Sequence, residues 1–292
     1  MIRFALLFIA LLYSTPFYAQ TKKAFLVGIS KYRDYNPGTH WNDINGANDV
    51  RLLAPILRKQ GFTIDSLTNK NATYGKIISR LDAFTKKCKA GDIVYLHFSC
   101  HGQPFEDLNG DEKDGWDESL VPVDADMVFQ KGKYEGNKHL TDDRLQQYIS
   151  NIRKKVGTKG MVYVVLDACH SGDSSRDGDM IGTDTIVRGT TYGFSKNNKP
   201  YRVKREMGSS HYKVSKVKDW ADVVYLEACR SYQYNVEIVE KGKHFGSLSY
   251  YVAKELQTVP LNQNMNWVWQ VEKNMKSDRR LWNQTIVIES SK

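Results

Sequence analysis

The chain of 292 residues carries 42 Lys and Arg against 33 Asp and Glu, a formal charge of +9, and 4 cysteines. So few cysteines, with no CxxC pair among them, exclude a disulfide scaffold and a zinc-ribbon site. The basic residues are scattered, and no arginine-rich or RNA-binding signature accompanies them, so the charge indicates a solvated surface and not a nucleic-acid partner.

The first nineteen residues predict a cleaved secretory signal peptide. Arg3 is followed by an apolar run, Phe4 to Leu12, and Ser14, Thr15 and Pro16 break that run before the small residue Ala19. The run is shorter than the roughly 17–25 residues of a membrane-spanning helix. We therefore expect a secreted or periplasmic domain of residues 20–292, soluble and without membrane contact once the signal at 1–19 is removed.

From residue 22 on, short apolar runs alternate with amphipathic segments. The expected strands are 24–30, 62–68, 93–99, 161–169, 222–229 and 285–290, and the expected helices are 44–60, 74–87, 142–155, 247–257 and 264–276. This alternation predicts an α/β fold with a mostly parallel sheet covered on both faces. Continuous apolar strands such as 161–166 agree, because parallel strands are buried on both sides.

Two long segments interrupt this alternation. Residues 102–141 are acidic at first, and residues 173–220 are polar, glycine-rich and basic. Neither has clear apolar periodicity, so both are expected as functional or flexible loops.

The residues with catalytic chemistry follow two of the expected strands. HFSCHG places His101 at one strand end, and LDACHSG places Cys169 at another, where parallel sheets bind their ligands. A thiol and an imidazole within reach suffice for nucleophilic acyl transfer, and the Gly102 and Cys169 N–H groups would form the oxyanion hole. Each residue alone is as well explained as a core residue; together they favour catalysis. Cys88, Cys100 and Cys229 are expected as buried thiols.

These residues also carry a family resemblance. AFLVGISKY, NDVRLL, HFSCHG, DGWDESLVPVD, TDDRL and LDACHSG stand in the order and spacing of the metacaspases. The chain resembles this family, a branch of the caspase-like peptidases with clostripain, gingipains and legumain, over nearly its whole mature length. The resemblance implies a caspase-like three-layer α/β/α sandwich and a cysteine endopeptidase with Cys169 and His101 as its dyad. Cys100 departs from the family, which usually has Gly there, and either adds redox sensitivity or fills space.

The resemblance also implies specificity. Metacaspases cleave after Arg or Lys, and their two acidic pocket residues match Asp49 and Asp167. A buried carboxylate pair can hold a guanidinium through paired hydrogen bonds. The alternatives are a helix-surface charge at Asp49 and a turn-forming strand end at Asp167.

Calcium is a further expectation, as an activator and not as a cofactor required for the chemistry. The acidic loop 107–118 nearly fits the EF-hand template, but Glu112 replaces the turn glycine and no helix pair flanks it. Many metacaspases require calcium, bound by carboxylates that match Asp117, Asp142 and Asp143, with Asp177 or Asp173 as a further ligand. The alternative is a solvated loop in which Asp142 caps the following helix.

The favoured function is hydrolysis of protein or peptide substrates after basic residues, by a monomer that also processes itself. Basic residues in the segment 173–220 are tethered beside the cleft, and Arg188, Lys204 and Arg205 are the expected cutting points because their neighbours keep them flexible. A legumain-like transpeptidase and a secreted calcium-binding module with a vestigial peptidase site are the alternatives.

Overall fold

The computed structural model describes residues 20–169, 185–202 and 208–292. The predicted signal peptide, residues 1–19, lies outside the described residues. Within them, no helix is long and apolar enough to cross a membrane.

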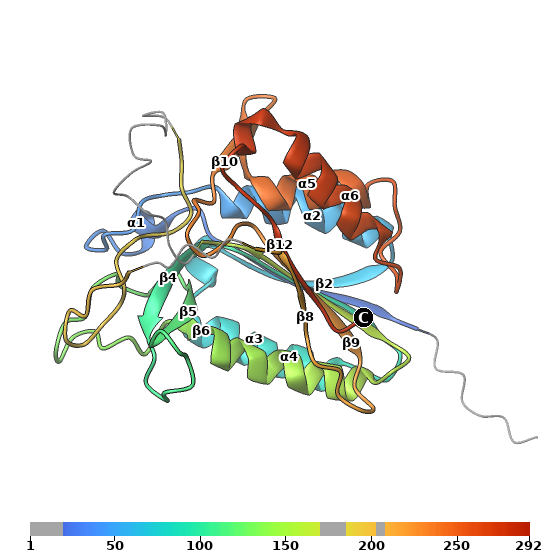
Figure 1. Cartoon of the computed structure of the whole chain (residues 1–292), viewed down its shortest axis with the longest axis horizontal. Coiled ribbons are helices and arrows are strands. Elements are labelled where there is room, and N and C mark those ends of the chain that lie inside the picture. Colours follow the sequence, from blue (N-terminus) through green and yellow to red (C-terminus); the bar gives the residue numbers. More distant parts are fainter. Residues whose placement is uncertain (1–19, 170–184, 203–207) are drawn as a thin grey trace, which may run out of the picture.

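A seven-stranded sheet forms the centre of the molecule (Figure 1). Its strands run side by side in the order β2-β1-β3-β7-β9-β12-β8. Their bounds are β1 Lys22–Gly28, β2 Phe62–Thr68, β3 Ile93–Ser99, β7 Met161–Asp167, β8 His211–Lys213, β9 Asp222–Glu227 and β12 Val287–Ser290. The first five strands in the sheet order are parallel, and β12 joins β9 antiparallel. The prediction of a mostly parallel sheet is confirmed.

Helices cover both faces of this sheet, which confirms the three-layer α/β/α sandwich (Figure 1). One face carries α2 (Gly46–Lys59), α5 (Ser247–Leu256) and α6 (Asn266–Ser277). The other carries α3 (Tyr74–Lys87) and α4 (Asp142–Val156). Every residue of β3 is buried, as expected of a strand covered on both sides.

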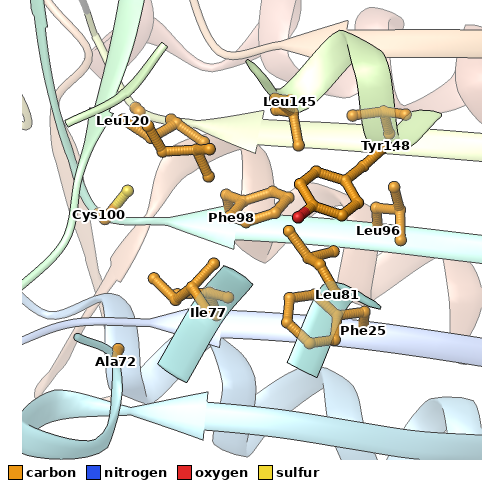
Figure 2. Packing of buried hydrophobic residues seen from close by; sticks show 14 of the residues in the cluster. Phe25, Ala72, Ile77, Leu81, Leu96, Phe98, Cys100, Leu120, Leu145 and Tyr148 are labelled. Carbon is orange, nitrogen blue, oxygen red and sulfur yellow. The ribbon is translucent and has the colours of Figure 1, made fainter. Parts of the chain in front are cut away.

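The packing under α3 and α4 is continuous with the sheet (Figure 2). The rings of Phe25 and Phe98 lie 6.2 Å apart between centroids, and Leu81 of α3 and Leu145 of α4 belong to the same buried cluster. Fully burying each such side chain stabilises the fold by about 1.5–3 kcal/mol. Cys100 also lies in this cluster, 2% exposed, and burial raises its pKa to about 12. Cys100 therefore contributes to the packing of this cluster.

The expectation of a loop over 102–141 is wrong for part of that segment. It forms a three-stranded antiparallel sheet of β4 (His101–Glu106), β5 (Trp116–Val121) and β6 (Leu140–Thr141). These strands are short and mix polar with apolar residues, which hides their periodicity. Other elements that the pattern did not predict are α1 (Tyr32–Tyr35), β8, the hairpin of β10 (Glu237–Glu240) and β11 (Lys243–Gly246), and two single turns, η1 (Asn69–Asn71) and η2 (Arg279–Leu281).

Two glycines allow α2 to approach the strand ends closely. A Cβ atom on Gly46 would lie 2.2 Å from the Ser99 carbonyl oxygen, and one on Gly28 would lie 2.4 Å from the Gly46 carbonyl oxygen. Both obstacles are backbone atoms, which cannot move aside as a flexible side chain would. The first turn of α2 is thereby held against β1 and β3.

We predict that Gly46→Ala lowers the free energy of unfolding by about 1–3 kcal/mol, the usual range for overpacking. Urea denaturation measures it. Gly75→Ala in α3 is the matched control, because nothing lies within 4 Å of its Cβ position and Ala is favoured over Gly in a helix by up to ~1 kcal/mol. Equal stability of the two variants would contradict the close approach.

Candidate active site

The sheet register brings Cys169 and His101 to equivalent positions. Strands β3 and β7 are neighbours, with Ser99 opposite Asp167. His101 and Cys169 each stand two residues beyond this pair. His101 is the first residue of β4, so the chain turns into the small sheet at this point instead of ending as a simple strand tip.

His101 is enclosed by aromatic rings. Its ring stacks on Trp41 at 4.8 Å and lies 5.0 Å from the ring of Tyr32. Nε2 is 2.9 Å from the Asn42 carbonyl oxygen, which can only accept, so Nε2 carries the proton. Within the described residues, Nδ1 has no hydrogen-bond partner. Burial lowers the pKa of His101 to about 4. The ring is therefore neutral near pH 7, with a free lone pair on Nδ1.

Cys169 is 1% exposed and makes two hydrogen bonds of interest. Its thiol donates to the Gln233 carbonyl oxygen at 2.9 Å. Its backbone N–H donates to the Arg188 carbonyl oxygen at 2.7 Å, which is the contact that an oxyanion-hole donor makes with a substrate carbonyl. The other expected donor, Gly102, lies in β4 opposite Leu120. The donor that the structure places on the Arg188 carbonyl is the Cys169 N–H.

The two predicted pocket residues lie together around one buried guanidinium. Arg188 is fully buried; its Nη1 lies 2.8 Å from an Asp49 oxygen and 3.3 Å from an Asp167 oxygen. Glu237 adds a third carboxylate, which accepts from Nε at 3.0 Å and from Nη2 at 2.9 Å. Asp49 is fully buried, so the alternative of a helix-surface charge is wrong.

Backbone and amide groups hold the three carboxylates in place. Asn45 donates twice to Glu237, both at 2.7 Å, and Asn235 donates to Asp167 at 2.7 Å. Glu237, Asn45 and Asn235 were missed by sequence reasoning. The strand β10 was not predicted, and an acidic residue in that part of the sequence does not reveal that its side chain meets Asn45 at the start of α2.

The two aspartates differ in protonation. Burial and the nearby Asp167 charge raise the pKa of Asp49 to about 7, against the opposing effect of Arg188. Burial acts in the same direction on Asp167, but Arg188 and the hydrogen bonds of Asn235 and Ser249 outweigh it, so its pKa is lowered. Proton uptake by the pocket near neutral pH therefore falls on Asp49.

The segment 186–188 lies in the cleft as an added strand. The Arg188 N–H donates to the Asn235 carbonyl at 3.0 Å, and the Glu237 N–H donates to the Ile186 carbonyl at 2.9 Å. Val187 forms an antiparallel bridge with Val236 between them. The expectation that Arg188 is flexible is therefore wrong, because its side chain and backbone are both held.

Gly189 continues this segment across the thiol-bearing residue. A Cβ atom there would lie 2.2 Å from the Cys169 carbonyl oxygen and 3.0 Å from its Cβ. Gly189 and His101 line the same cavity of about 940 Å³, together with Trp41. The peptide bond between residues 188 and 189 thus lies between the thiol-bearing residue and the cavity that holds the imidazole.

A separate acidic cluster lies at the other end of the small sheet. Oxygens of Asp107, Asp111 and Asp117 lie within 4.8 Å of one another. Burial, followed by the charges of Asp142, Asp107, Asp143 and Asp111, raises the pKa of Asp117 to about 7. The loop joins strands β4 and β5 and not two helices, so it is no EF-hand. Thr141, and not Asp142, caps α4.

Several predicted residues lie outside the described part of the chain. Asp173 and Asp177 belong to the interval 170–184, and Lys204 and Arg205 belong to 203–207. The described part therefore holds three of the expected calcium ligands and one of the expected cutting points.

The sandwich and the placement of thiol, imidazole and acidic pocket beyond its parallel strands define a caspase-like α/β/α protein. Residues 21–279 match the family model described as the caspase domain. The chain therefore belongs to this family of cysteine peptidases, and the predicted family and fold are confirmed.

Proteins named as metacaspases are similar to this chain in sequence. Metacaspase-1 of Eremothecium gossypii is 24% identical over 280 residues, which cover 82% of this chain and 58% of that protein. Metacaspase-1 of Plasmodium falciparum is 34% identical over 176 residues, 56% of this chain and 25% of that protein. The chain thus spans less than two thirds of these relatives. The solved structure of protein GSU0716 from Geobacter sulfurreducens is similar in fold, with a TM-score of 0.61, 19% identity and 93% of both chains covered.

We predict that Arg188→Met lowers the free energy of unfolding by about 3–5 kcal/mol when measured well above pH 7, because the buried carboxylates lose their cation. The variant is made in the Cys169→Ala background so that the chain is not cut. The loss should shrink as the pH falls. Arg188 opposes the rise in the pKa of Asp49, so removal of Arg188 raises that pKa further above the unfolded value. The folded variant then binds a proton at a higher pH than the parent and regains stability as the pH falls through that pKa.

Arg280→Met in the same background is the matched control. Arg280 pairs with Glu240 and Asp278 on the surface, where ion pairs contribute about 0–1 kcal/mol. Thermal or urea unfolding at several pH values compares the two. A loss at Arg188 that is small and independent of pH would contradict the described pocket.

Proposed function

We propose that this chain is a cysteine endopeptidase that cleaves after Arg or Lys, with Cys169 as nucleophile and His101 as general acid and base. One observation carries the proposal. A basic side chain, Arg188, fills a pocket of three carboxylates while its carbonyl oxygen accepts a hydrogen bond from the Cys169 N–H at 2.7 Å. This is the geometry of a substrate whose residue before the cleaved bond is basic.

The chemistry follows from the two side chains. His101 Nδ1 takes the thiol proton, and the Cys169 sulfur attacks the carbonyl carbon. The charge that develops on the oxygen is stabilised by the Cys169 N–H, with Gly102 as the second expected donor. His101 then gives its proton to the leaving amine, and water hydrolyses the thioester to release the acid. The low pKa of the buried His101, about 4, favours a neutral ring that can begin as a base.

The pocket supports a preference for Arg or Lys through charge and geometry. A guanidinium offers a planar fork of donors, and Arg188 uses Nε and both terminal nitrogens on Asp49, Asp167 and Glu237. A lysine ammonium would gain the same charge attraction with fewer fixed hydrogen bonds. An acidic or apolar residue there would leave buried carboxylates without a cation, which is strongly unfavourable.

Self-processing is the second part of the proposal. The segment 186–189 is part of the chain, so its effective concentration at the cleft is set by the tether. Three features support cutting after Arg188: the antiparallel backbone pairing, the filled acidic pocket and the close approach of Gly189 to Cys169. Until it is cut and leaves, the same segment occludes the cleft.

Calcium activation is the third part. Asp117, Asp142 and Asp143 would hold the ion, since hard cations prefer carboxylate oxygens. The raised pKa of Asp117, about 7, supports a fit, because it reflects like charges gathered around a buried carboxylate. Asp142 and Asp143 form the first turn of α4, so an ion here would fix the small sheet against that helix.

We predict that the purified protein produces a fragment whose new first residue is Gly189, identified by intact mass and terminal sequencing. Arg188→Lys should keep this cut, whereas Arg188→Asp and Arg188→Leu should abolish it, because both lose the ion pairs of the pocket. Cys169→Ala and His101→Ala should give no fragments at all.

Two controls separate the parts of this proposal. Arg202→Leu removes a basic residue that lies in the longer stretch 173–220 but outside the pocket. This variant should leave the 188/189 cut unchanged. A peptide with Arg before the scissile bond, supplied in trans, should be cleaved much faster than its Asp counterpart. Peptide cleavage without the Gly189 fragment would refute self-processing alone; preference for Asp would refute the proposed specificity.

We predict that calcium binds with a dissociation constant of roughly 0.1–1 mM, as in extracellular sites, and that Asp117→Asn weakens it severely. Affinity should rise with pH across about 7, by at most about tenfold per pH unit, because the Asp117 proton must leave before the metal binds. Calorimetry on the Cys169→Ala protein measures this without activity. Asp114→Asn, in the same loop, is the control and should bind as before; equal effects would point to diffuse charge attraction.

A further inference from the structure

A second thiol lies beside the proposed nucleophile. Cys169 follows β7 and Cys229 follows β9, and these strands are parallel neighbours. Their last register pair is Leu166 with Glu227, and the Ala228 N–H still donates to the Leu166 carbonyl at 3.1 Å. Cys169 and Cys229 therefore both lie just beyond the last paired residues of adjacent strands.

Their side chains converge on one acceptor. The Cys169 thiol lies 2.9 Å and the Cys229 thiol 3.5 Å from the same oxygen, the Gln233 carbonyl. Neither residue is in a disulfide, and they are 1% and 7% exposed. The shared acceptor, together with the hydrogen bonding between the two thiols, places the two sulfurs close to each other, as a disulfide requires.

We propose that Cys169 and Cys229 form a reversible disulfide when a peroxide oxidises the active site, so that Cys229 acts as a resolving cysteine. The proposal rests on the reactive thiolate character proposed for Cys169. It assigns a modification site, with hydrogen peroxide or an organic hydroperoxide as the oxidant.

The chemistry takes two balanced steps. The Cys169 thiol is oxidised by one equivalent of peroxide to sulfenic acid, and the peroxide is reduced to water or an alcohol. The Cys229 sulfur then attacks the Cys169 sulfur, the S–O bond breaks, and the departing hydroxide takes the Cys229 proton and leaves as water. The product has one S–S bond, and two electrons have passed from the two thiols to the peroxide.

The environment assigns the two roles. Hydrogen bonding with Cys169, followed by burial, holds the pKa of Cys229 well above its usual value, so Cys229 stays a protonated thiol and is a poor first target. A substrate carbonyl must reach Cys169 before it can react. When segment 186–189 leaves the cleft so that a substrate can enter, a peroxide can enter as well. Segment 186–189 covers Cys169 while it is docked, so the docked segment should slow the oxidation of Cys169 without preventing it.

The test is peptide mapping of the full-length protein without reduction, after incubation with a several-fold molar excess of hydrogen peroxide, because each oxygen added to a thiol consumes one peroxide. Trypsin separates the four cysteines into different peptides: Cys169 falls in residues 160–176 and Cys229 in 219–230. The wild type should give these two peptides joined, with the loss of two hydrogen atoms. Dithiothreitol should separate them and restore most of the initial peptidase activity.

Cys229→Ser keeps a hydroxyl donor for the Gln233 carbonyl but removes the resolving sulfur. In this variant the Cys169 peptide should gain two or three oxygen atoms, and dithiothreitol should restore almost none of the variant's own starting activity. Cys88→Ser is the matched control, since Cys88 is another buried thiol bonded to a carbonyl, that of Phe84. It should behave as the wild type.

Two outcomes would overturn the proposal. In one, Cys169 of the wild type accumulates two or three oxygens as fast as it does in Cys229→Ser; in the other, Cys169 joins the Cys100 peptide instead. The mapping needs no turnover, so it still decides if the protein proves to have no peptidase activity. Failure of the disulfide and failure of the proposed function are therefore distinguishable.

Discussion

The ion cluster around Arg188 is the interaction on which the candidate site depends. Three buried carboxylates, from α2, the end of β7 and the start of β10, surround one guanidinium. Isolated charges in an apolar interior are strongly unfavourable, and such a cluster persists only when each charge is paired and hydrogen-bonded. Elements far apart in the sequence are therefore held together by a buried cation that comes from a segment outside the named helices and strands. In the proposed function, departure of segment 186–189 leaves these carboxylates as a site that attracts another basic residue.

The parallel register makes this arrangement possible. Because Gly28, Ser99 and Asp167 are aligned across β1, β3 and β7, the residues that follow them gather at one edge of the sheet. The helix α2 reaches this edge through Gly46, whose missing side chain allows contact with the Ser99 carbonyl. Asp49 lies one turn further along α2 and accepts a hydrogen bond from Ser99 Oγ at 2.6 Å. A close backbone contact thus positions one wall of the pocket.

Sequence patterns reveal those parts of the site that depend on local order. The strand–helix alternation predicts the sandwich, and the positions of the strand ends alone place Cys169 and His101 at equivalent positions beyond neighbouring strands. Asp49 and Asp167 follow from family resemblance, since nothing in a helical pattern marks Asp49 as buried. Glu237, Asn45 and Asn235 could not be predicted, because their contacts join distant segments: Asn45 and Glu237 are 192 residues apart, and Asn235 and Asp167 are 68 residues apart. The small sheet was missed because its strands are short and mix polar with apolar residues.

Arg188 shows most clearly where local reasoning fails. Polar and glycine-rich neighbours predict a flexible chain, although the apolar residues Ile186 and Val187 directly precede Arg188, and Ile186 packs against the hydrophobic core. The segment is held instead by contacts with distant residues. These are backbone hydrogen bonds to residues 235–237, ion pairs in the carboxylate pocket and the hydrogen bond from the Cys169 N–H. None of these contacts requires an apolar side chain, so a hydrophobicity pattern cannot report them. In the proposed function, a substrate uses these same contacts, so it must compete with Arg188 for all of them together. Under that proposal the docked segment both restrains catalysis at Cys169 and shields its thiol, and a single displacement of the segment relieves both.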